Sequence, residues 1–366
     1  MKTLILIIAM TMVMSLQAYE SDQHTVPDFE LADVGVDISA FIYKQTALAV
    51  EKINRDLESL PLKIEQTQKR IQSDEALEKP MLMRELKKNL AADTARLKSI
   101  KTKNGVVAAV YDELGGTFTW EDQRDGVFGL PLSIIPYEKN IKDGQQITFV
   151  PKRRHTIYAF AGFHRLISPS YFVFCSSLKM FGVYFGVDKL GHMFNQGYEY
   201  YVKHHQGLSL DKVIEWGEST ERGTYGTLVD GVYSNGDLAA NFSGFHFYEN
   251  LLNPVTIGDK TYSPILTIKE DSTVEFNTQN PIEEATFLAP FISQHLNEAI
   301  NPSHYEKLQR LVVIKAVKNR CENVKRFYHL KDSQEIKALT DSMTLWHGKN
   351  YGHRNYELLR IDELCF

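Results

Sequence analysis

The sequence has few cysteines and no excess of positive charge. Three cysteines in 366 residues are too few for a small disulfide-stapled scaffold. Lys and Arg number 41 against 46 Asp and Glu, giving a net charge of -5, so no global basic field attracts a nucleic-acid backbone. Internal repeats and low-complexity tracts are also lacking. These absences exclude a miniprotein, a repeat array and, as an expectation, a nucleic-acid partner.

The composition that is present is that of an ordinary globular protein. Hydrophobic residues make up 43% of the chain and charged residues 24%, which argues against wholesale disorder. A chain of 366 residues is long enough for one large domain or two ordinary ones. We therefore expect a folded protein with a substantial hydrophobic core.

The N-terminus has the features of a secretory signal. Lys2 precedes an apolar run at residues 4–14, and the small residue Ala18 precedes the expected cut. The run is shorter than the roughly 20 residues that span a bilayer. We expect residues 1–18 to be a signal peptide and the protein to be periplasmic or secreted. An uncleaved anchor is the alternative, because Leu16 is large for its place before the cut.

The three cysteines suggest one disulfide in an oxidising compartment. Cys175 lies in an apolar stretch, where a buried thiol is the simplest expectation. Cys321 and Cys365 are then the plausible bridge, which would tie the C-terminal tail to the helix around Cys321. No cysteine lies in or just after the N-terminal apolar run, so the sequence offers no thiol for a lipoprotein anchor.

Residues 37–103 are predicted to form long amphipathic helices. Their apolar residues recur at spacings of three to five, which is typical of one buried helical face. Pro61 and Pro80 interrupt the pattern, and each is expected near the start of a helix. Two or three helices folded as a hairpin, with coiled-coil character, are the simplest prediction.

Further helices are predicted in the middle and near the end of the chain. Helical patterning runs from about Tyr184 to His205, Ser209 caps a second helix, and a third begins near Ser234. Ser303 opens a capping box for the last long helix, whose residues 311–314 are expected to be buried.

The predicted fold class is mainly α (α+β). Short apolar runs separated by turn residues indicate a small antiparallel β meander near residues 255–276. We divide the chain into the signal peptide, an N-terminal helical hairpin at 19–104 and a helical body at 105–366 that contains the meander.

Four polar residues share a helical spacing that would bring them together. Asp188 and His192 are four residues apart, as are Asp237 and Asn241, so each pair leaves one face of its helix. Glu218 lies on the helix predicted between them. If the helices are adjacent, these five side chains converge on one pocket, and they are the candidate catalytic residues.

Such a group suits two kinds of chemistry. Oxygen ligands with one imidazole suit a divalent metal that activates water, although the cofactor and its metal stay unassigned. Two carboxylates in different environments suit glycoside cleavage, with Glu218 as the acid. A third interpretation is structural: Asp237 would serve the start of its helix, His192 would donate to Asp188, and Asn241 would bond across a helix pair.

The middle of the chain resembles a family of envelope proteins. The motif reads Asp188-Lys189-x-Gly191-His192, then Ser234-x-Gly236-Asp237-x-x-Ala240-Asn241-x-x-Gly244. It looks like the pattern of YfiM-like envelope lipoproteins and, more distantly, of VanZ-like membrane proteins, over residues 183–252. The resemblance implies a small helical unit at the cell envelope with four shared polar positions, and it implies no reaction.

The chain departs from that pattern in two respects. It lacks the cysteine that carries a lipid, and its acidic residues before Gly231 are spaced differently. The choice among Glu218, Glu221 and Asp230 therefore stays open.

We predict an exported envelope protein with hydrolase activity on peptidoglycan or lipid headgroups, carried by the five candidate residues. The alternative is a non-catalytic binding or adaptor protein with a structural polar cluster, whose residues 37–103 hold a protein partner. In either case the expected partners are envelope glycan or lipid. The basic run Lys152-Arg153-Arg154-His155 is a further point of contact for an anionic glycan or headgroup.

Overall fold

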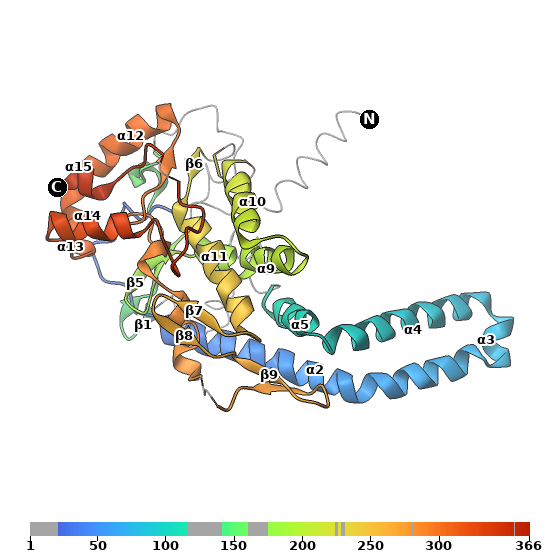
Figure 1. The fold of residues 1–366 in the computed structure, drawn as a ribbon. Helices are drawn as coiled ribbons and strands as arrows, with labels where there is room; N and C mark the ends of the chain where they lie inside the picture. The colour runs from blue at the N-terminus through green and yellow to red at the C-terminus, as the bar shows by residue number, and fades with distance from the viewer. Residues whose placement is uncertain are drawn as a thin grey trace, which may run out of the picture.

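The computed structural model is mainly helical with small antiparallel sheets, as predicted (Figure 1). It describes residues 21–115, 141–159, 175–223, 226–227, 231–279, 282–354 and 356–366. The expected signal peptide lies outside the described residues. Within the described ranges, no helix has both the length and the apolar character to cross a membrane.

A pair of antiparallel helices projects from the body. Figure 1 shows α2 (Gly35–Ile71) running outward, the short α3 (Asp74–Glu78) turning the chain, and α4 (Pro80–Ile100) returning beside α2. The helix α5 (Lys103–Gly115) then packs against the inner part of α2. This is the arrangement predicted for residues 37–103.

One proline departs from the expectation. Pro80 begins α4, as predicted, but Pro61 lies inside α2 and does not begin a helix. A proline within a helix lacks the N–H of one backbone hydrogen bond and crowds the preceding turn. The helix continues through Pro61, because α2 packs along α4 on both sides of this position with Leu60 buried, and this packing offsets the lost bond.

The body begins with a three-stranded antiparallel sheet. Its strands are β3 (Thr148–Phe149), β4 (Ser177–Met180) and β5 (Val183–Gly186), in the order β3-β4-β5. The prediction of a helix from Tyr184 was therefore wrong over its first residues. Tyr184 pairs with Lys179 in a tight hairpin that turns at Phe181 and Gly182, both with positive φ. The helical periodicity of the following residues gives no sign of this turn.

The helices that follow form the centre of the body. The chain continues through α8 (Asp188–Gly191), a π-helical turn η7 (His192–Gln196), α9 (Gly197–His205), α10 (Leu210–Arg222) and α11 (Asn235–Asn250). Ser209 and Ser234 cap α10 and α11, as predicted. Most side chains of α11 are buried, and α11 packs against both η7 and α9.

A glycine contact sets the distance between η7 and α11. A Cβ atom at Gly244 would lie 1.8 Å from the carbonyl oxygen of Met193, so only glycine fits this crossing. The two backbones therefore approach closely, and His192 of η7 comes within hydrogen-bond distance of Asn241 of α11.

The remaining strands form small two-stranded ladders. The predicted meander is two separate hairpins: β7 (Val255–Ile257) pairs with β8 (Lys260–Tyr262), and β9 (Leu266–Ile268) pairs with β10 (Val274–Phe276). Two further ladders join β1 (Ile141–Lys142) to β2 (Gln145–Gln146), and β6 (Val232–Tyr233) to β11 (His304–Tyr305). Short 3-10 turns are η4 (Arg153–His155), η8 (Glu284–Thr286), η9 (Ala289–Phe291) and η10 (Gln294–Leu296).

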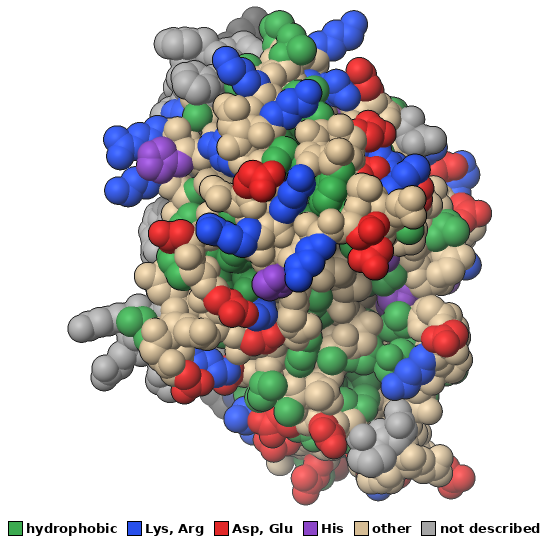
Figure 2. All heavy atoms as spheres, turned by 90° about the vertical axis from the view of Figure 1, so that its left-hand side faces the viewer, with side chains coloured by type: hydrophobic (Ala, Val, Ile, Leu, Met, Phe, Trp, Pro, Cys, Tyr) green, Lys and Arg blue, Asp and Glu red, His purple; other side chains and the backbone are tan. Residues whose placement is uncertain are grey.

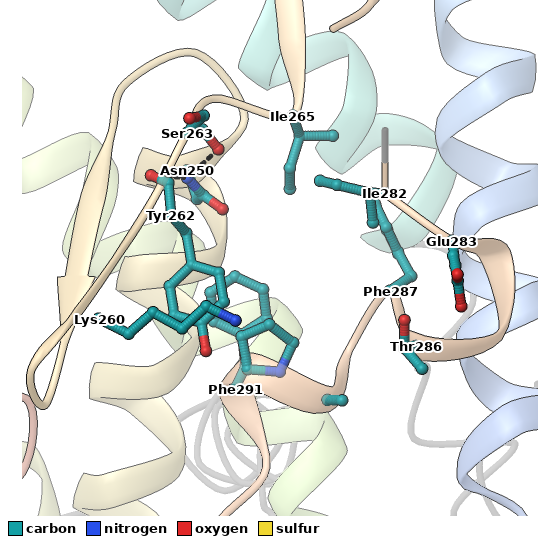
Figure 3. Close-up of a pocket in the computed structure, with 12 residues that line it drawn as sticks. Asn250, Lys260, Tyr262, Ser263, Ile265, Ile282, Glu283, Thr286, Phe287 and Phe291 are labelled. Carbon is teal, nitrogen blue, oxygen red and sulfur yellow. Dashed lines mark hydrogen bonds between the residues drawn. The ribbon is translucent and has the colours of Figure 1, made fainter. Parts of the chain in front are cut away.

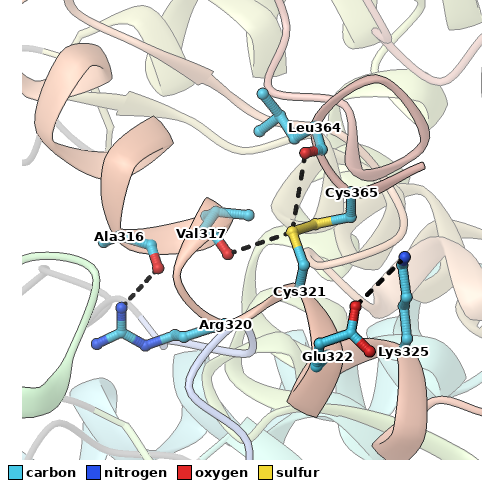
Figure 4. Close-up of a disulfide and its surroundings, with 8 residues drawn as sticks. All are labelled: Ala316, Val317, Arg320, Cys321, Glu322, Lys325, Leu364 and Cys365. Atoms are coloured by element: carbon cyan, nitrogen blue, oxygen red, sulfur yellow. Dashed lines mark hydrogen bonds and ion pairs between the residues drawn. A yellow bond between two sulfur atoms is a disulfide. The ribbon is translucent and has the colours of Figure 1, made fainter.

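The C-terminal helices have a hydrophobic core of their own. They are α12 (Lys307–Lys318), α13 (Cys321–Phe327), α14 (Ser333–Ser342) and α15 (Ile361–Cys365). Their buried side chains, with Ile157 and Tyr158, form a second cluster apart from the main core. The predicted disulfide between Cys321 and Cys365 joins α13 to α15 (Figure 4), while Cys175 is buried elsewhere.

Two expectations for α12 were wrong. The helix begins at Lys307 and Ser303 does not cap it, because residues 304–305 are drawn into the ladder with β6. The stretch 311–314 is not buried as a whole either, since Leu311 is 68% exposed. Only Val313 of these four side chains is buried, because one turn of a surface helix presents one residue in three or four to the core.

Loss of the disulfide should destabilise the protein. We expect the double variant Cys321→Ser, Cys365→Ser to lose about 2–5 kcal/mol of unfolding free energy, because the bridge closes a long loop in the unfolded chain. Denaturant melts of wild type and variant measure this loss. Reductant should lower the wild-type midpoint to that of the variant and leave the variant unchanged, and an equal response of both proteins would contradict the prediction.

Candidate functional site

The structure brings four of the five candidate residues together. Asp188 and His192 leave α8 and η7 on the side that faces Asp237 and Asn241 of α11. His192 Nδ1 lies 3.0 Å from Asn241 Oδ1, and His192 Nε2 lies 3.5 Å from Asp237 Oδ2. The spacing of four residues in each helix thus predicted this convergence. The expected bond from His192 to Asp188 is replaced by these two contacts.

A lysine that sequence reasoning passed over lies at the centre of the group. Lys189 Nζ is 2.5 Å from Asp188 Oδ2, 2.5 Å from Asp237 Oδ1 and 2.7 Å from Glu298 Oε1. The Lys189 side chain is 0% exposed, and none of the three acidic side chains exceeds 3%. We call Asp188, Lys189, His192, Asp237 and Glu298 the buried charge cluster.

Glu298 is the second residue of the buried charge cluster that the sequence did not indicate. It lies between η10 and β11, in a stretch without helical or strand periodicity. Its Oε1 accepts a hydrogen bond of 2.5 Å from Ser234 Oγ, and its backbone N–H donates to Gln23 Oε1 at 2.5 Å. The cluster therefore joins segments that are far apart in the chain.

The start of α11 is held by the same network. Ser234 Oγ accepts from the Asp237 backbone N–H at 3.1 Å, so the serine both caps the helix and donates to Glu298. The backbone N–H of Ser234 donates to Glu221 Oε1 at 2.9 Å. Glu221 thus takes the acceptor role expected of the Asp237 side chain at the start of α11, and the Asp237 carboxylate is left for Lys189.

The acids of this region differ in their protonation. Burial raises the pKa of Glu298 to about 7, and it also raises the pKa of Asp188 and, strongly, that of Glu221. Burial acts on Asp237 in the same direction, but the nearby imidazole and Lys189 outweigh it and lower the Asp237 pKa. Asp237 is therefore the ionised partner of Lys189, and Glu298 titrates near neutral pH.

Glu218 is not part of the buried charge cluster. Its carboxylate pairs with Arg354 and lies 4.0 Å from Arg222. Of the three acidic alternatives, Glu221 contacts the network through Ser234, and Asp230 lies outside the described residues. Each helical pair was predicted from a spacing of four residues within one helix. Glu218 was included only because it lies between the two pairs in the sequence, which does not fix where its side chain points.

The three carboxylates of the cluster have the arrangement of a cation site. Asp188, Asp237 and Glu298 offer oxygens that all lie within 4.8 Å of one another, and no other such group of three occurs among the described His, Cys, Asp and Glu residues. The ammonium of Lys189 contacts one oxygen of each. A divalent metal would have to displace this ammonium, so the residues present fit a lysine better than a metal.

One open cavity lies at the C-terminal end of α11. It has a volume of about 420 Å³ and is bounded by Asn250, the β8 residues Lys260 and Tyr262, and Phe287 and Phe291 (Figure 3). Asn250 is 13 residues after Asp237 on α11, which is about 20 Å along a helix. This cavity therefore does not reach the buried charge cluster.

Comparison with protein-family models, with curated proteins and with solved structures finds no match to this chain. The similarity of residues 183–252 to YfiM-like and VanZ-like proteins stays an expectation based on the motif. The function has to be inferred from the geometry of the chain itself.

The titration of Glu298 should make stability depend on pH. Its pKa is about 7 in the folded state against 4.5 for an unperturbed glutamate, so the folded state binds the extra proton. This contribution to stability is fully present below about pH 4.5 and is lost as the pH rises through about 7. We expect Glu298→Gln, which cannot ionise, to gain stability relative to wild type between pH 5 and pH 8, in denaturant melts. Parallel curves for the two proteins would contradict the assignment.

Removal of the central ammonium should be strongly destabilising. We expect Lys189→Met to lose about 3–5 kcal/mol of unfolding free energy near pH 8, because buried carboxylates are left without a cation. The loss should be smaller at pH 5, where Glu298, whose pKa is raised to about 7 by burial, is neutral. Lys212→Met is the control, since that lysine pairs with Glu215 on the exposed surface. Equal unfolding free energies of the two variants would contradict the prediction that the Lys189 ammonium stabilises the buried carboxylates.

Proposed function

We propose that this chain is a non-catalytic binding or adaptor protein of the cell envelope, and that its projecting helices contact a protein partner. We call residues 55–97 of α2, α3 and α4 the outer arm. The observation that carries the proposal is that the outer arm extends from the body while the conspicuous polar cluster is sealed inside it.

The outer arm is stabilised by contacts between its own helices. Lys63 pairs with Asp93 at 2.9 Å, and Arg96 pairs with Asp56 at 3.0 Å, across the seam that buries apolar side chains. The Asn54 side chain bonds to the backbone of Val274 at the edge of the body. Beyond this point α2 packs on α3 and α4, so the outer arm adds little to the core of the body.

Apolar side chains remain exposed on the outer arm. Leu62 is 62% exposed, Leu77 is 64% exposed and Met81 is 82% exposed, and the last two lie where α3 meets α4 at the tip. Exposed apolar groups on a rigid helix pair suit docking against an amphipathic helix of another protein. A projecting helix pair with an apolar tip thus supports a protein partner.

The assignment to the envelope depends on two other features. The N-terminal apolar run is typical of an exported chain. The disulfide between Cys321 and Cys365 is the kind of bond that persists in oxidising compartments such as the periplasm. Together they support a periplasmic or secreted location.

Hydrolysis of peptidoglycan or lipid headgroups is the second candidate. The observation in its favour is that Glu298 and Asp237 are neighbouring carboxylates whose pKa values are shifted in opposite directions, as in an acid and base pair. Against it, these side chains are at most 3% exposed, and substrate has to reach a catalytic group. The adaptor proposal needs no such access.

Crosslinking at the outer arm should identify the partner interface. A photo-reactive residue at Leu62 or Leu77 should give a discrete crosslinked species in cells, because both positions are exposed on the arm. The same residue at Leu208 or Leu345, which are exposed on the body, is the matched control. Equal crosslinking at all four positions would contradict the proposal.

A shortened arm gives the complementary result. Replacement of residues 62–95 by a short Gly-Ser link should leave the melting temperature of the body nearly unchanged, and it should abolish the crosslinks. The hydrolase candidate is tested beside it, by incubating wild type and Glu298→Gln with peptidoglycan and envelope lipids, with and without chelator. Products that only the wild type forms, while Glu298→Gln stays folded at the assay temperature, would favour hydrolysis over the adaptor.

A further inference from the structure

The outward face of α12 is apolar. Leu308 is 75% exposed and Leu311 is 68% exposed, while Val313 and Val317 of the same helix are buried. Residues at spacings of three, four and seven share one helical face, so Leu308, Leu311, Val312 and Lys315 form one stripe on the surface. This helix thus has an inner apolar face for the core and an outer apolar stripe that the core does not use.

A groove lies beside this stripe. It has a volume of about 560 Å³ and lies between α12 and residues 154–159. Its floor is apolar, with Ile157, Leu311 and Val312, and its remaining described lining residues include three cations and no acid. The cations are Arg154, Lys315 and Arg320.

The guanidinium of Arg320 is fixed in place by the backbone. Arg320 Nη1 donates to the carbonyl oxygen of Ala316 at 2.7 Å, and Nη2 donates to the carbonyl oxygen of His155 at 2.5 Å. Figure 4 shows Arg320 reaching back to Ala316 at the end of α12, next to the disulfide. Carbonyl oxygens orient the guanidinium but do not neutralise its charge.

The surroundings of the groove are basic in a chain that is acidic as a whole. Residues 152–159 and 306–326 hold ten Lys and Arg residues against two Glu, whereas the net charge of the chain is -5. Figure 2 views the side of the molecule that carries α12, and Lys and Arg side chains are concentrated in its upper half, at the level of α12 in Figure 1. Positive charge is therefore localised around the apolar stripe.

We propose that this surface docks onto a bilayer that contains anionic phospholipid. We call Arg154, Ile157, Leu308, Leu311, Val312, Lys315 and Arg320 the α12 surface. An exposed apolar stripe flanked by cations is the pattern of helices that lie in the membrane interface, where the leucines enter the acyl boundary and the cations contact phosphate. The proposal is independent of the outer arm, which is a different part of the molecule.

The apolar stripe distinguishes a bilayer from other polyanions. A nucleic acid or an acidic protein would be attracted by Arg154, Lys315 and Arg320 alone. Exposed leucines gain nothing from phosphate groups, whereas in a bilayer each buried CH₂ contributes about 0.8 kcal/mol. The combination of the two kinds of side chain selects the bilayer.

Flotation with lipid vesicles tests the proposal on the full chain. Wild type should partition onto vesicles of phosphatidylcholine with phosphatidylglycerol more strongly than onto phosphatidylcholine alone, and salt should weaken the anionic component. Arg154→Glu with Lys315→Glu should lower that partition coefficient by at least about 25-fold, since each basic residue near an anionic surface contributes about fivefold. Leu308→Ser with Leu311→Ser should also lower it.

Matched controls lie on the outer arm. Lys87→Glu with Lys88→Glu and Leu62→Ser with Leu77→Ser change the same residue types at exposed positions far from α12. All variants share one N-terminal segment, so differences among them report the changed surface. Both control pairs should partition as wild type does.

A local probe places the contact. Leu311→Trp should be quenched by phosphatidylglycerol with brominated acyl chains, and Leu62→Trp should not. Three results would overturn the proposal: equal quenching at the two positions, wild-type partition of the charge-reversed α12 variant, or loss with the charge variant but not with the leucine variant. The last result would indicate an acidic macromolecule in place of a bilayer.

Discussion

The ammonium of Lys189 is the interaction on which the body of this protein depends. It contacts carboxylates from α8, from α11 and from the stretch before β11, and all of these groups are withdrawn from water. A buried ion pair is stabilising only when its desolvation is offset by close charges and further hydrogen bonds. Ser234 and Gln23 supply such bonds at Glu298, so the cap of α11 and the N-terminal segment belong to the same network. The network thereby fixes the positions of α8, α11 and the stretch before β11 relative to one another.

The same interaction directs the functional interpretation to the surface. The three carboxylates have the spacing of a cation site, but a lysine already supplies the cation. Within the cluster, the Lys189 ammonium neutralises the charge of the buried carboxylates. Glu298 is the carboxyl group that titrates near neutral pH. The features that face outward are the outer arm, with its exposed tip, and the α12 surface, with its leucines among cations. A rigid body with two such surfaces suits a protein that holds a partner near a membrane.

Part of the candidate site could be predicted because it follows from spacing within single helices. Asp188 with His192, and Asp237 with Asn241, each lie four residues apart, and the helical pattern places each pair on one face. Lys189 was missed because a lysine next to a helical acid is usually a solvated side chain. Glu298 was missed because it comes from an irregular stretch, and only its contact with Lys189 gives it a role. Glu218 was included for its place between the two pairs, yet it faces Arg354.

The sequence by itself determined the local elements of this protein. Helical periodicity marked residues 37–103, Ser209 and Ser234 marked helix starts, and the odd count of cysteines indicated the pair Cys321 and Cys365. These signals are local or compositional, so they can be recognised in a single amino-acid sequence. Tertiary structure alone decided what was buried and what was left outside. It drew His304 and Tyr305 away from α12 into a ladder with β6, and it left Leu311 exposed, because this pairing and this exposure depend on residues that are distant along the chain.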